Sequence, residues 1–205
     1  MRIACVSDIH GNLPALEAVL DDIDRLGVAE FTDDERQQLR DLPPTVSLPE
    51  APDVLFYHAG PANDMDVLRP FSSDDEMQSL FGERNETFFV AGHDHTQRLR
   101  HWQGRTMCIC GSVGLTVEGN GARYLILERR QAGWEPQHRS VDYDVKRVLQ
   151  RFVETDYIGR TGPMGRLFVR HVATGTEQVV PFVRWYRAHG EIEFADAVER
   201  FLNLN

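Results

Sequence analysis

The chain begins Met1-Arg2-Ile3-Ala4-Cys5-Val6-Ser7-Asp8-Ile9-His10-Gly11-Asn12. The apolar run from Ile3 to Val6 predicts a strand over residues 2–7, and a run without alternation is typical of a strand that is covered on both faces. A polar turn follows at residues 8–12. Apolar residues then recur at helical spacing after Pro14, until Gly27 ends the pattern. This strand–loop–helix unit places polar residues at the carboxyl end of the strand, where α/β folds bind their ligands.

The same arrangement recurs further along the chain. Apolar runs predict strands over residues 54–57 and 87–91, and each of them ends in a turn that contains histidine. Turn residues predict two hairpins. Three more helices are expected, the first of them from a capping box at residues 32–35 and the last from apolar residues on one face. The hairpins are expected over 97–110 and 122–143, and the helices over 32–42, 74–81 and 144–153. Beyond Tyr157 we expect a loop or linker through Gly165, then a strand over 166–172 and two amphipathic segments, over 179–186 and 192–202.

Composition limits the class of protein. The chain has 205 residues, of which 41% are hydrophobic and 26% charged, as in a soluble globular domain. The apolar runs are strand-sized, so we expect no membrane span, and residues 1–8 reach a charge too soon for the core of a signal peptide. Three cysteines, an odd number, fit a reducing cytoplasm. The net charge of −10 disfavours nucleic acid as a general partner, because an acidic surface repels a polyanion.

Five side chains at the predicted strand ends are candidate metal ligands: Asp8, His10, His58, His93 and His95. Residues two apart on an extended backbone share a face, so Asp8 and His10 can point the same way, and so can His93 and His95. Carboxylate and imidazole ligands without thiolates suit Mn, Fe, Zn or Co. Taken singly, each residue has a structural alternative, such as a capped turn for Asp8 or a partly buried histidine for His58. Their order on three successive strand ends favours a metal site.

This order of motifs resembles the calcineurin-like metallophosphoesterases, especially their small bacterial members, over residues 1–153. The motifs that carry the resemblance are residues 1–20, Leu39–Pro43, Tyr57–Pro61, Gly92–His95, Gly111–Gly114 and Val141–Asp144. The resemblance implies an α/β (α+β) fold, a four-layer αββα sandwich of two mixed sheets flanked by helices. It divides the chain into a metallophosphoesterase domain over 1–157 and a C-terminal extension over 158–205, which we expect to pack on the same domain.

The resemblance also implies a dinuclear metal centre. Asp8, His10 and His95 are expected on one divalent ion, and His58 and His93 on the other. The implied reaction is the hydrolysis of a small phosphomonoester, phosphodiester or nucleotide, in which a metal-bound hydroxide attacks the phosphorus in line. The partner implied is a small phosphorylated substrate. No catalytic residue beyond the metal ligands is assigned.

Two family motifs are missing from the printed sequence. One is a Gly-Asp whose aspartate bridges the ions, and the other is a Gly-Asn-His that supplies an asparagine ligand and a histidine for the leaving group. Part of one sheet is therefore unaccounted for, since no strand is expected between Gly27 and Thr45, although Ile3–Val6 calls for neighbours on both sides. Asn63, Asp64 and Asp66 could substitute as ligands, but a solvated loop is the simpler interpretation.

Three explanations of this absence stay open. In the first, a segment of the natural chain is missing between Leu26 and Thr32, which predicts a break in the chain there and an open slot or donated strands beside Ile3–Val6. Alternatively the chain is a degenerate, non-catalytic member that acts as a binding or scaffold module. In the third, the deletion is genuine, and the chain forms a homo-oligomer in which residues 179–202 cover the exposed apolar edge of the sheet.

Overall fold

Eight strands and seven helices make up the part of the chain that the computed structural model describes, residues 1–25, 45–62 and 72–204. In chain order these are β1 (Arg2–Cys5), α1 (Leu13–Arg25), β2 (Thr45–Leu48), β3 (Ala51–Tyr57), α3 (Asp74–Phe81), β4 (Phe88–Ala91), β5 (Arg98–Trp102), β6 (Arg105–Ile109), β7 (Gly121–Arg130), β8 (Gly133–Asp142), α4 (Val145–Glu154), α5 (Tyr157–Thr161), α6 (Pro163–Thr174), α7 (Val179–Ala188) and α8 (Phe194–Leu204). Both expected hairpins are confirmed, and so are the expected helices over 74–81 and 144–153.

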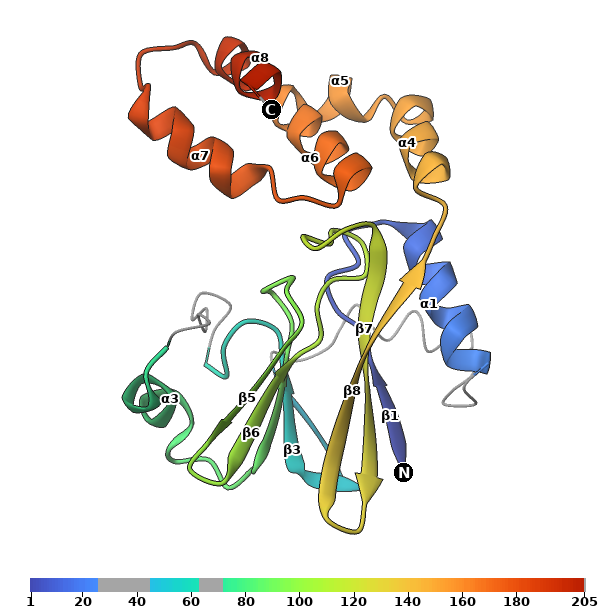
Figure 1. Ribbon diagram of the computed structural model, residues 1–205, viewed down its shortest axis with the longest axis vertical. Coiled ribbons are helices and arrows are strands. Elements are labelled where there is room, and N and C mark those ends of the chain that lie inside the picture. Colours follow the sequence, from blue (N-terminus) through green and yellow to red (C-terminus); the bar gives the residue numbers. More distant parts are fainter. Residues whose placement is uncertain (26–44, 63–71, 205) are drawn as a thin grey trace.

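The strands form two sheets (Figure 1). One has three strands in the order β1-β7-β8, and the other has five in the order β2-β3-β4-β6-β5. In the five-stranded sheet, β3, β4 and β6 run parallel, while β2 and β5 are antiparallel at its edges. This sheet is mixed, as expected, whereas β1, β7 and β8 pair only in antiparallel fashion. Because β3 and β4 are parallel neighbours, the loops at their carboxyl ends lie at one edge of the sheet.

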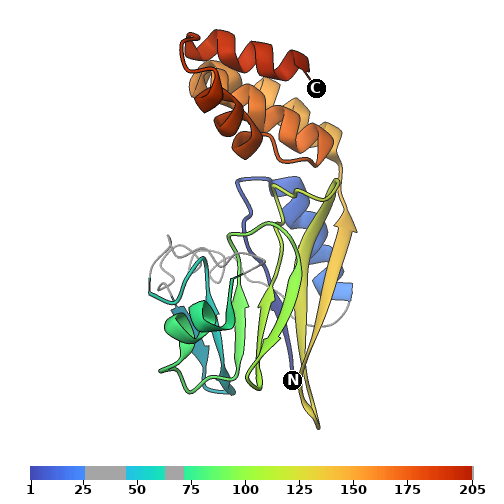
Figure 2. The same cartoon turned by 60° about the vertical axis from the view of Figure 1, so that its left-hand side comes forward.

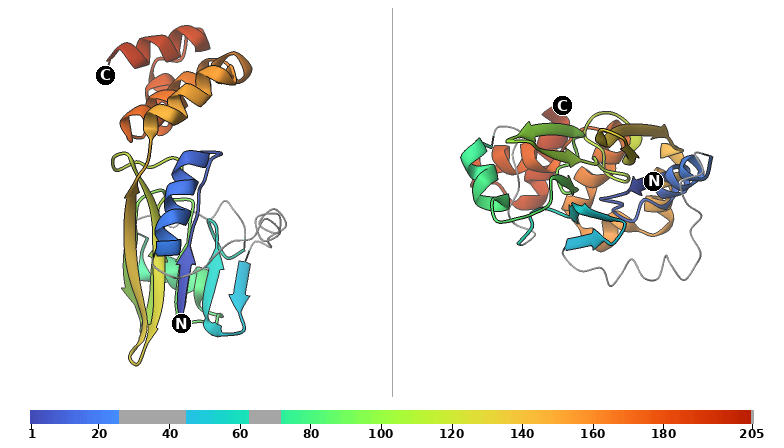
Figure 3. Two further views of the ribbon diagram at one scale, coloured as in Figure 1. Left: turned by 90° about the vertical axis from the view of Figure 1, so that its right-hand side faces the viewer. Right: turned by 90° about the horizontal axis from the view of Figure 1, so that it is seen from below.

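The two sheets pack face to face between α1 and α3, so the expected αββα sandwich is confirmed (Figure 3). Strand β7 shows how alternation divides the core. Its Leu125 and Leu127 pack between the sheets with residues of β3 and β4, while Tyr124 and Ile126 pack beneath α1. On the far side, Phe81 of α3 packs against the outer face of the five-stranded sheet.

Strand β1 departs from the expectation of a strand with neighbours on both sides. It pairs antiparallel with β7, and within the described residues β7 is its one hydrogen-bonded partner. Of its four residues only Cys5 is buried. Its other edge faces an open apolar groove of about 260 Å³, which β1 lines together with residues of β2, β3 and β4. This groove is in the position of the open slot beside Ile3–Val6 that a missing segment would leave.

Strand β2 was not expected from the sequence. Thr45–Leu48 carries only two apolar residues in four and follows a pair of prolines. It becomes a strand because a tight turn at Pro49 and Glu50 returns the chain along β3, where Thr45 pairs opposite Tyr57. Pairing with β3, and not the strand propensity of its own residues, makes Thr45–Leu48 a strand.

The C-terminal region corrects two predictions. The expected strand over 166–172 is part of α6, and the expected loop through Gly165 contains α5 and the start of α6. Gly162 separates the two helices with φ 69°, a conformation that glycine adopts without strain, and Pro163 stands in the first turn of α6. Leu167 and His171, four residues apart, are both fully buried, which is helical and not strand periodicity.

Helices α4–α8 form a layer beyond the carboxyl ends of β1, β3 and β4 (Figures 1 and 2). Helices α6, α7 and α8 share an apolar cluster around Leu167, Phe182 and Phe201. Helix α4 belongs to this layer by its contacts with α6, and it also contacts α1. The division of the chain after Tyr157 stays a prediction.

Some predictions lie outside the described residues. These are the helix over 32–42, the break between Leu26 and Thr32, and the alternative ligands Asn63, Asp64 and Asp66. Across residues 1–25, 45–62 and 72–204, no helix combines the length and the apolar character that crossing a membrane requires.

Candidate metal centre

All five predicted ligands meet at the carboxyl ends of β1, β3 and β4. Asp8 and His10 lie in the loop between β1 and α1, and His58 directly follows β3. His93 and His95 follow β4 after Gly92, whose N–H donates to the carbonyl of His58 at 2.9 Å. Parallel pairing of β3 and β4 brings the last two loops together, and the facing sheet supplies the first.

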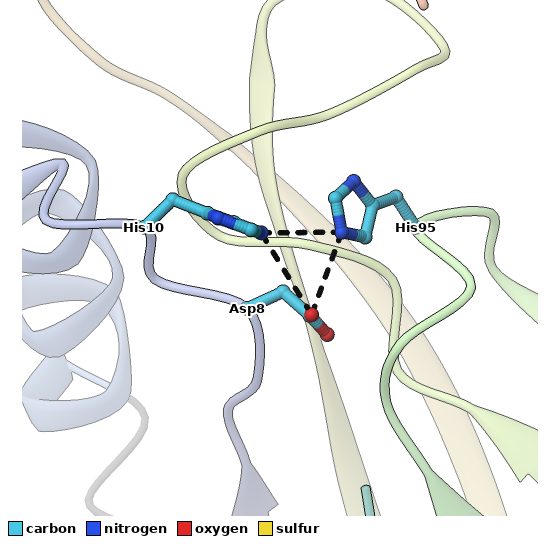
Figure 4. Close-up of side chains that lie close together, drawn as sticks. All are labelled: Asp8, His10 and His95. Atoms are coloured by element: carbon cyan, nitrogen blue, oxygen red, sulfur yellow. Dashed lines mark hydrogen bonds and ion pairs between the residues drawn. The ribbon is translucent and has the colours of Figure 1, made fainter. Parts of the chain in front are cut away.

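The carboxylate of Asp8 is the centre of the cluster. Its Oδ1 lies 3.4 Å from Nε2 of His95, and 3.8 Å from Nε2 of both His10 and His58. The Nε2 atoms of His10 and His95 are 3.2 Å apart, so these three side chains converge on one point (Figure 4). Asp8, His10 and His95 are also the one group of three acidic, histidine or cysteine side chains in the described residues whose ligand atoms all lie within 4.8 Å.

A second pair of histidines, His58 and His93, also lies beside Asp8. Nδ1 of His93 is 3.4 Å from Nε2 of His58, and their rings meet edge to face with centroids 5.2 Å apart. The backbone N–H of His93 donates to Oδ2 of Asp8 at 2.9 Å, and the hydroxyl of Ser7 donates to the same oxygen at 2.7 Å. Oδ2 is therefore used within the protein, while Oδ1 faces the imidazoles.

The backbone is strained at the same place. Asp8, His10 and His93 have φ of 54°, 50° and 63°, in the left-handed region that residues with a side chain seldom adopt. Within the described residues, only Gln103 and Asp156 are further non-glycine residues with positive φ. Such strain persists where surrounding contacts impose it, and it concentrates at functional sites.

The loop Gly111–Gly114 holds the Asp8 turn in this conformation. Val113 and Gly114 donate backbone hydrogen bonds to the carbonyls of Ser7 and Asp8, and the hydroxyl of Ser112 donates to the Asp8 carbonyl at 2.9 Å. Only glycine fits at position 114, since a Cβ there would lie 1.8 Å from the carbonyl oxygen of Ile9. The sequence drew attention to this loop only as a motif and assigned it no role.

Electrostatics keep Asp8 ionised and shift the pKa values of His10 and His95 in opposite directions. Burial alone raises the pKa of Asp8, but hydrogen bonding with His95 and Ser7, and the nearby charges of His95 and His58, outweigh it and lower the pKa to about 2. Burial, helped by repulsion from His95, lowers the pKa of His10. Burial also lowers the pKa of His95, but the hydrogen bond and the electrostatic attraction between His95 and Asp8 outweigh burial, so the pKa of His95 is raised.

The donor set fits a divalent ion on each side of Asp8. Ligands about 2.1 Å from a tetrahedral ion lie about 3.4 Å from one another. The separations of 3.2 Å between His10 and His95, 3.4 Å between His95 and Asp8, and 3.4 Å between His58 and His93 match this spacing. The structure therefore brings the five residues together with suitable geometry, while their role as ligands stays a prediction.

No protein-family model matches the chain, and no curated protein matches it. Among solved structures, it is similar to a metallophosphoesterase from Sphaerobacter thermophilus, with 18% identity, a TM-score of 0.60, and coverage of 85% of this chain and 100% of the other. It is also similar to a hypothetical protein from Pyrococcus horikoshii OT3, with 13% identity, a TM-score of 0.66, and coverage of 86% and 99%. The protein thus has the calcineurin-like metallophosphoesterase fold.

Proposed function

We propose that this protein is a metal-dependent phosphoesterase that hydrolyses a small phosphomonoester, phosphodiester or nucleotide. Two divalent ions, of Mn, Fe, Zn or Co, would be held by Asp8, His10 and His95 on one side and by His58 and His93 on the other. The observation that carries the proposal is the position of Asp8 Oδ1, within 3.4–3.8 Å of histidines from three different strand ends.

Asp8 also offers a substitute for the family's bridging aspartate, whose motif the printed sequence lacks. Its Oδ1 lies 3.8 Å from Nε2 of His10 and equally far from Nε2 of His58, so it is near a histidine of each pair. Its Oδ2 is occupied by the hydroxyl of Ser7 and the N–H of His93. Oδ1 would therefore be the Asp8 oxygen open to an ion held with either pair.

Divalent ions at this position would polarise the phosphoryl oxygens and make water a stronger nucleophile near neutral pH. The residues of the chain prepare the site for them. Asp8 stays ionised because its pKa is about 2, and His10 stays neutral, as a ligand must, because burial lowers its pKa. The Gly111–Gly114 loop fixes the Asp8 turn, so the donors need little rearrangement.

A second candidate is a non-catalytic binding or scaffold module. It is favoured by the ligand count, since the motifs of the family's asparagine and bridging aspartate are missing and, among the described residues, the His58 side of the site offers two imidazoles of its own. In that case one ion at Asp8, His10 and His95 is expected, with little turnover.

Metal analysis together with a hydrolysis assay tests the proposal. Protein loaded with Mn, Fe, Zn or Co would be assayed with 4-nitrophenyl phosphate and bis(4-nitrophenyl) phosphate, and its metal content measured by mass spectrometry. We expect two ions per chain and a loss of about 100-fold in rate for His93→Ala. His101→Ala, at an exposed histidine on β5, is the matched control. One ion with no turnover supports the binding module, and no bound ion overturns both candidates.

We also propose a cytoplasmic location. Cys5, Cys108 and Cys110 are all free thiols that lie buried in the sandwich, which fits a reducing compartment. Cell fractionation would test this, and recovery of the native protein outside the cytoplasm would contradict it.

A further inference from the structure

A cavity of about 560 Å³ lies between the N-terminal end of α1 and helices α4 and α6. Its volume falls in the range of about 300–1,000 Å³ that small-molecule sites occupy. His10 lines the cavity as well as the metal centre, so a molecule bound through a phosphate at the metal centre could extend past His10 into it. We call this cavity the α4 pocket.

The wall of the α4 pocket is apolar and partly aromatic. Leu115 and Val172 line it together with Phe152, Tyr157 and Phe168. The rings of Phe152 and Tyr157 pack with centroids 4.6 Å apart. Rings of this kind favour a flat apolar or aromatic group, which gains from dispersion and from release of water.

The charges at the α4 pocket have one sign. The chain as a whole carries 32 Asp and Glu against 22 Lys and Arg, yet Arg147 and Arg151 line this pocket, and no carboxylate lines it among the residues that the structure describes. The two arginines are one turn apart on α4, so they present their guanidinium groups from one face.

Both arginines can exchange their present partners for a ligand. Arg147 pairs with Glu17 at 2.8 Å and Arg151 with Glu154 at 3.1 Å. Their side chains are 56% and 65% exposed, and ion pairs so exposed contribute little stability. Guanidinium groups bind carboxylate and phosphate through paired hydrogen bonds.

The start of α1 does not serve as an alternative anion site. The N–H of Leu13 donates to the carbonyl of Gly11, and that of Ala15 donates to Oδ1 of Asn12. Pro14 has no N–H to offer. Recognition of an anion in this pocket therefore falls to the arginines.

From these features we infer the class of substrate. The substrate is a phosphoester whose organic part is a flat apolar or aromatic group carrying a second anionic group, a carboxylate or another phosphate. The organic part occupies the α4 pocket, and Arg147 and Arg151 bind the second anion. The hydrolysis of such a compound rests on the proposed function, whereas its binding in the pocket does not.

A binding experiment without metal tests the pocket alone. In the presence of a chelator, 2-naphthoate and the uncharged 2-naphthylmethanol would be titrated by their fluorescence. We expect 2-naphthoate to bind more tightly, and the double variant Arg147→Gln/Arg151→Gln to weaken its binding at least fivefold. Lys146→Gln removes the same kind of charge from α4 outside the pocket lining, so it is the matched control and should change binding less than twofold.

A second variant tests the apolar wall without disturbing the core. Leu13 lines the pocket and is 55% exposed, so Leu13→Glu should fold. It places a carboxylate beside the arginines, and we expect it to weaken 2-naphthoate binding at least fivefold. Val153→Glu, at a residue of α4 that is 81% exposed and does not line the pocket, is its control.

Kinetics with metal-loaded protein separate the two proposals. The ratio of kcat/KM for a carboxylated naphthyl phosphate to that for plain naphthyl phosphate should exceed 10, and should fall at least fivefold in the arginine double variant. Hydrolysis of both compounds at equal efficiency, with naphthoate binding insensitive to the arginines, would overturn the pocket assignment and leave the phosphoesterase intact. Arginine-dependent binding without any hydrolysis would overturn the proposed function and leave the pocket assignment standing.

Discussion

The two histidine pairs on either side of Asp8 are unequal. His10 and His95 form a compact group with Asp8, and the side chain of His95 is only 14% exposed. His58 and His93 contact each other, but they form no such group of three with Asp8 among the described residues. An ion beside His95 would have three protein donors close together, Asp8, His10 and His95. An ion beside His58 would have His58 and His93, and would need Asp8 as a further donor. We therefore expect the His95 side to bind the tighter ion.

The largest effect is expected at the residue that both sides share. Asp8→Asn keeps the size of the side chain and an acceptor for Ser7, but it removes the negative charge that faces three imidazoles. We expect the loss of both ions and a fall in hydrolysis of about 1,000-fold, measured by metal analysis and with an aryl phosphate. Asp21→Asn, at an exposed position of α1, should retain both. An Asp8→Asn protein that still holds two ions would break the assignment of Asp8 as the bridge.

The next prediction distinguishes the contributions of the two histidine pairs to metal binding. His95→Ala should empty the tighter side and weaken the other through Asp8, giving less than one ion per chain. His58→Ala should leave one ion in place, because Asp8, His10 and His95 remain together. Equilibrium dialysis against Zn or Mn measures both. Equal losses in the two variants would contradict the ranking of the sites.

Removing the support of the Asp8 turn should have a smaller effect. In Gly114→Ala the new Cβ meets the Ile9 carbonyl, so the Gly111–Gly114 loop must shift away from Asp8. We expect a destabilisation of about 2 kcal/mol and weaker binding of metal on the His95 side, measured by thermal unfolding and dialysis. Gly190→Ala is the control, since its Cβ would meet nothing nearer than 3.9 Å.

The smallest and most gradual effect is that of pH. Metal must displace any proton on its ligands, so affinity falls as pH falls through the pKa of each ligand. The pKa of His95 is raised in the metal-free protein, so competition on its side begins at a higher pH than for an ordinary histidine, while Asp8 stays ionised down to about pH 2. Metal titrations between pH 8 and 5 should show affinity on the His95 side falling by about tenfold per unit once His95 is protonated. An affinity that does not change over this range would exclude His95 as a ligand.

Much of the sandwich was predictable, because its elements carry strong local signals. The hairpin around Gln103 and Gly104 was predicted from its turn residues, and α4 from the apolar residues on one of its faces, such as Val148 and Phe152. The errors fall where local signals conflict with packing. Gly162 and Pro163 indicate a loop, yet they join two helices, since the apolar residues of α6 can be buried only against α7 and α8.

The sequence by itself determined the five candidate ligands and their places at strand ends, because residue type and short-range periodicity are local properties. Only the tertiary structure decided that Asp8 Oδ1 lies near histidines from three strand ends, that β1 pairs with β7 and also lines an open groove, and that Arg147 and Arg151 share a pocket with His10. These features depend on residues far apart in the chain, such as Asp8 and His58 or His10 and Arg147, and the packing of sheets and helices alone brings such residues together.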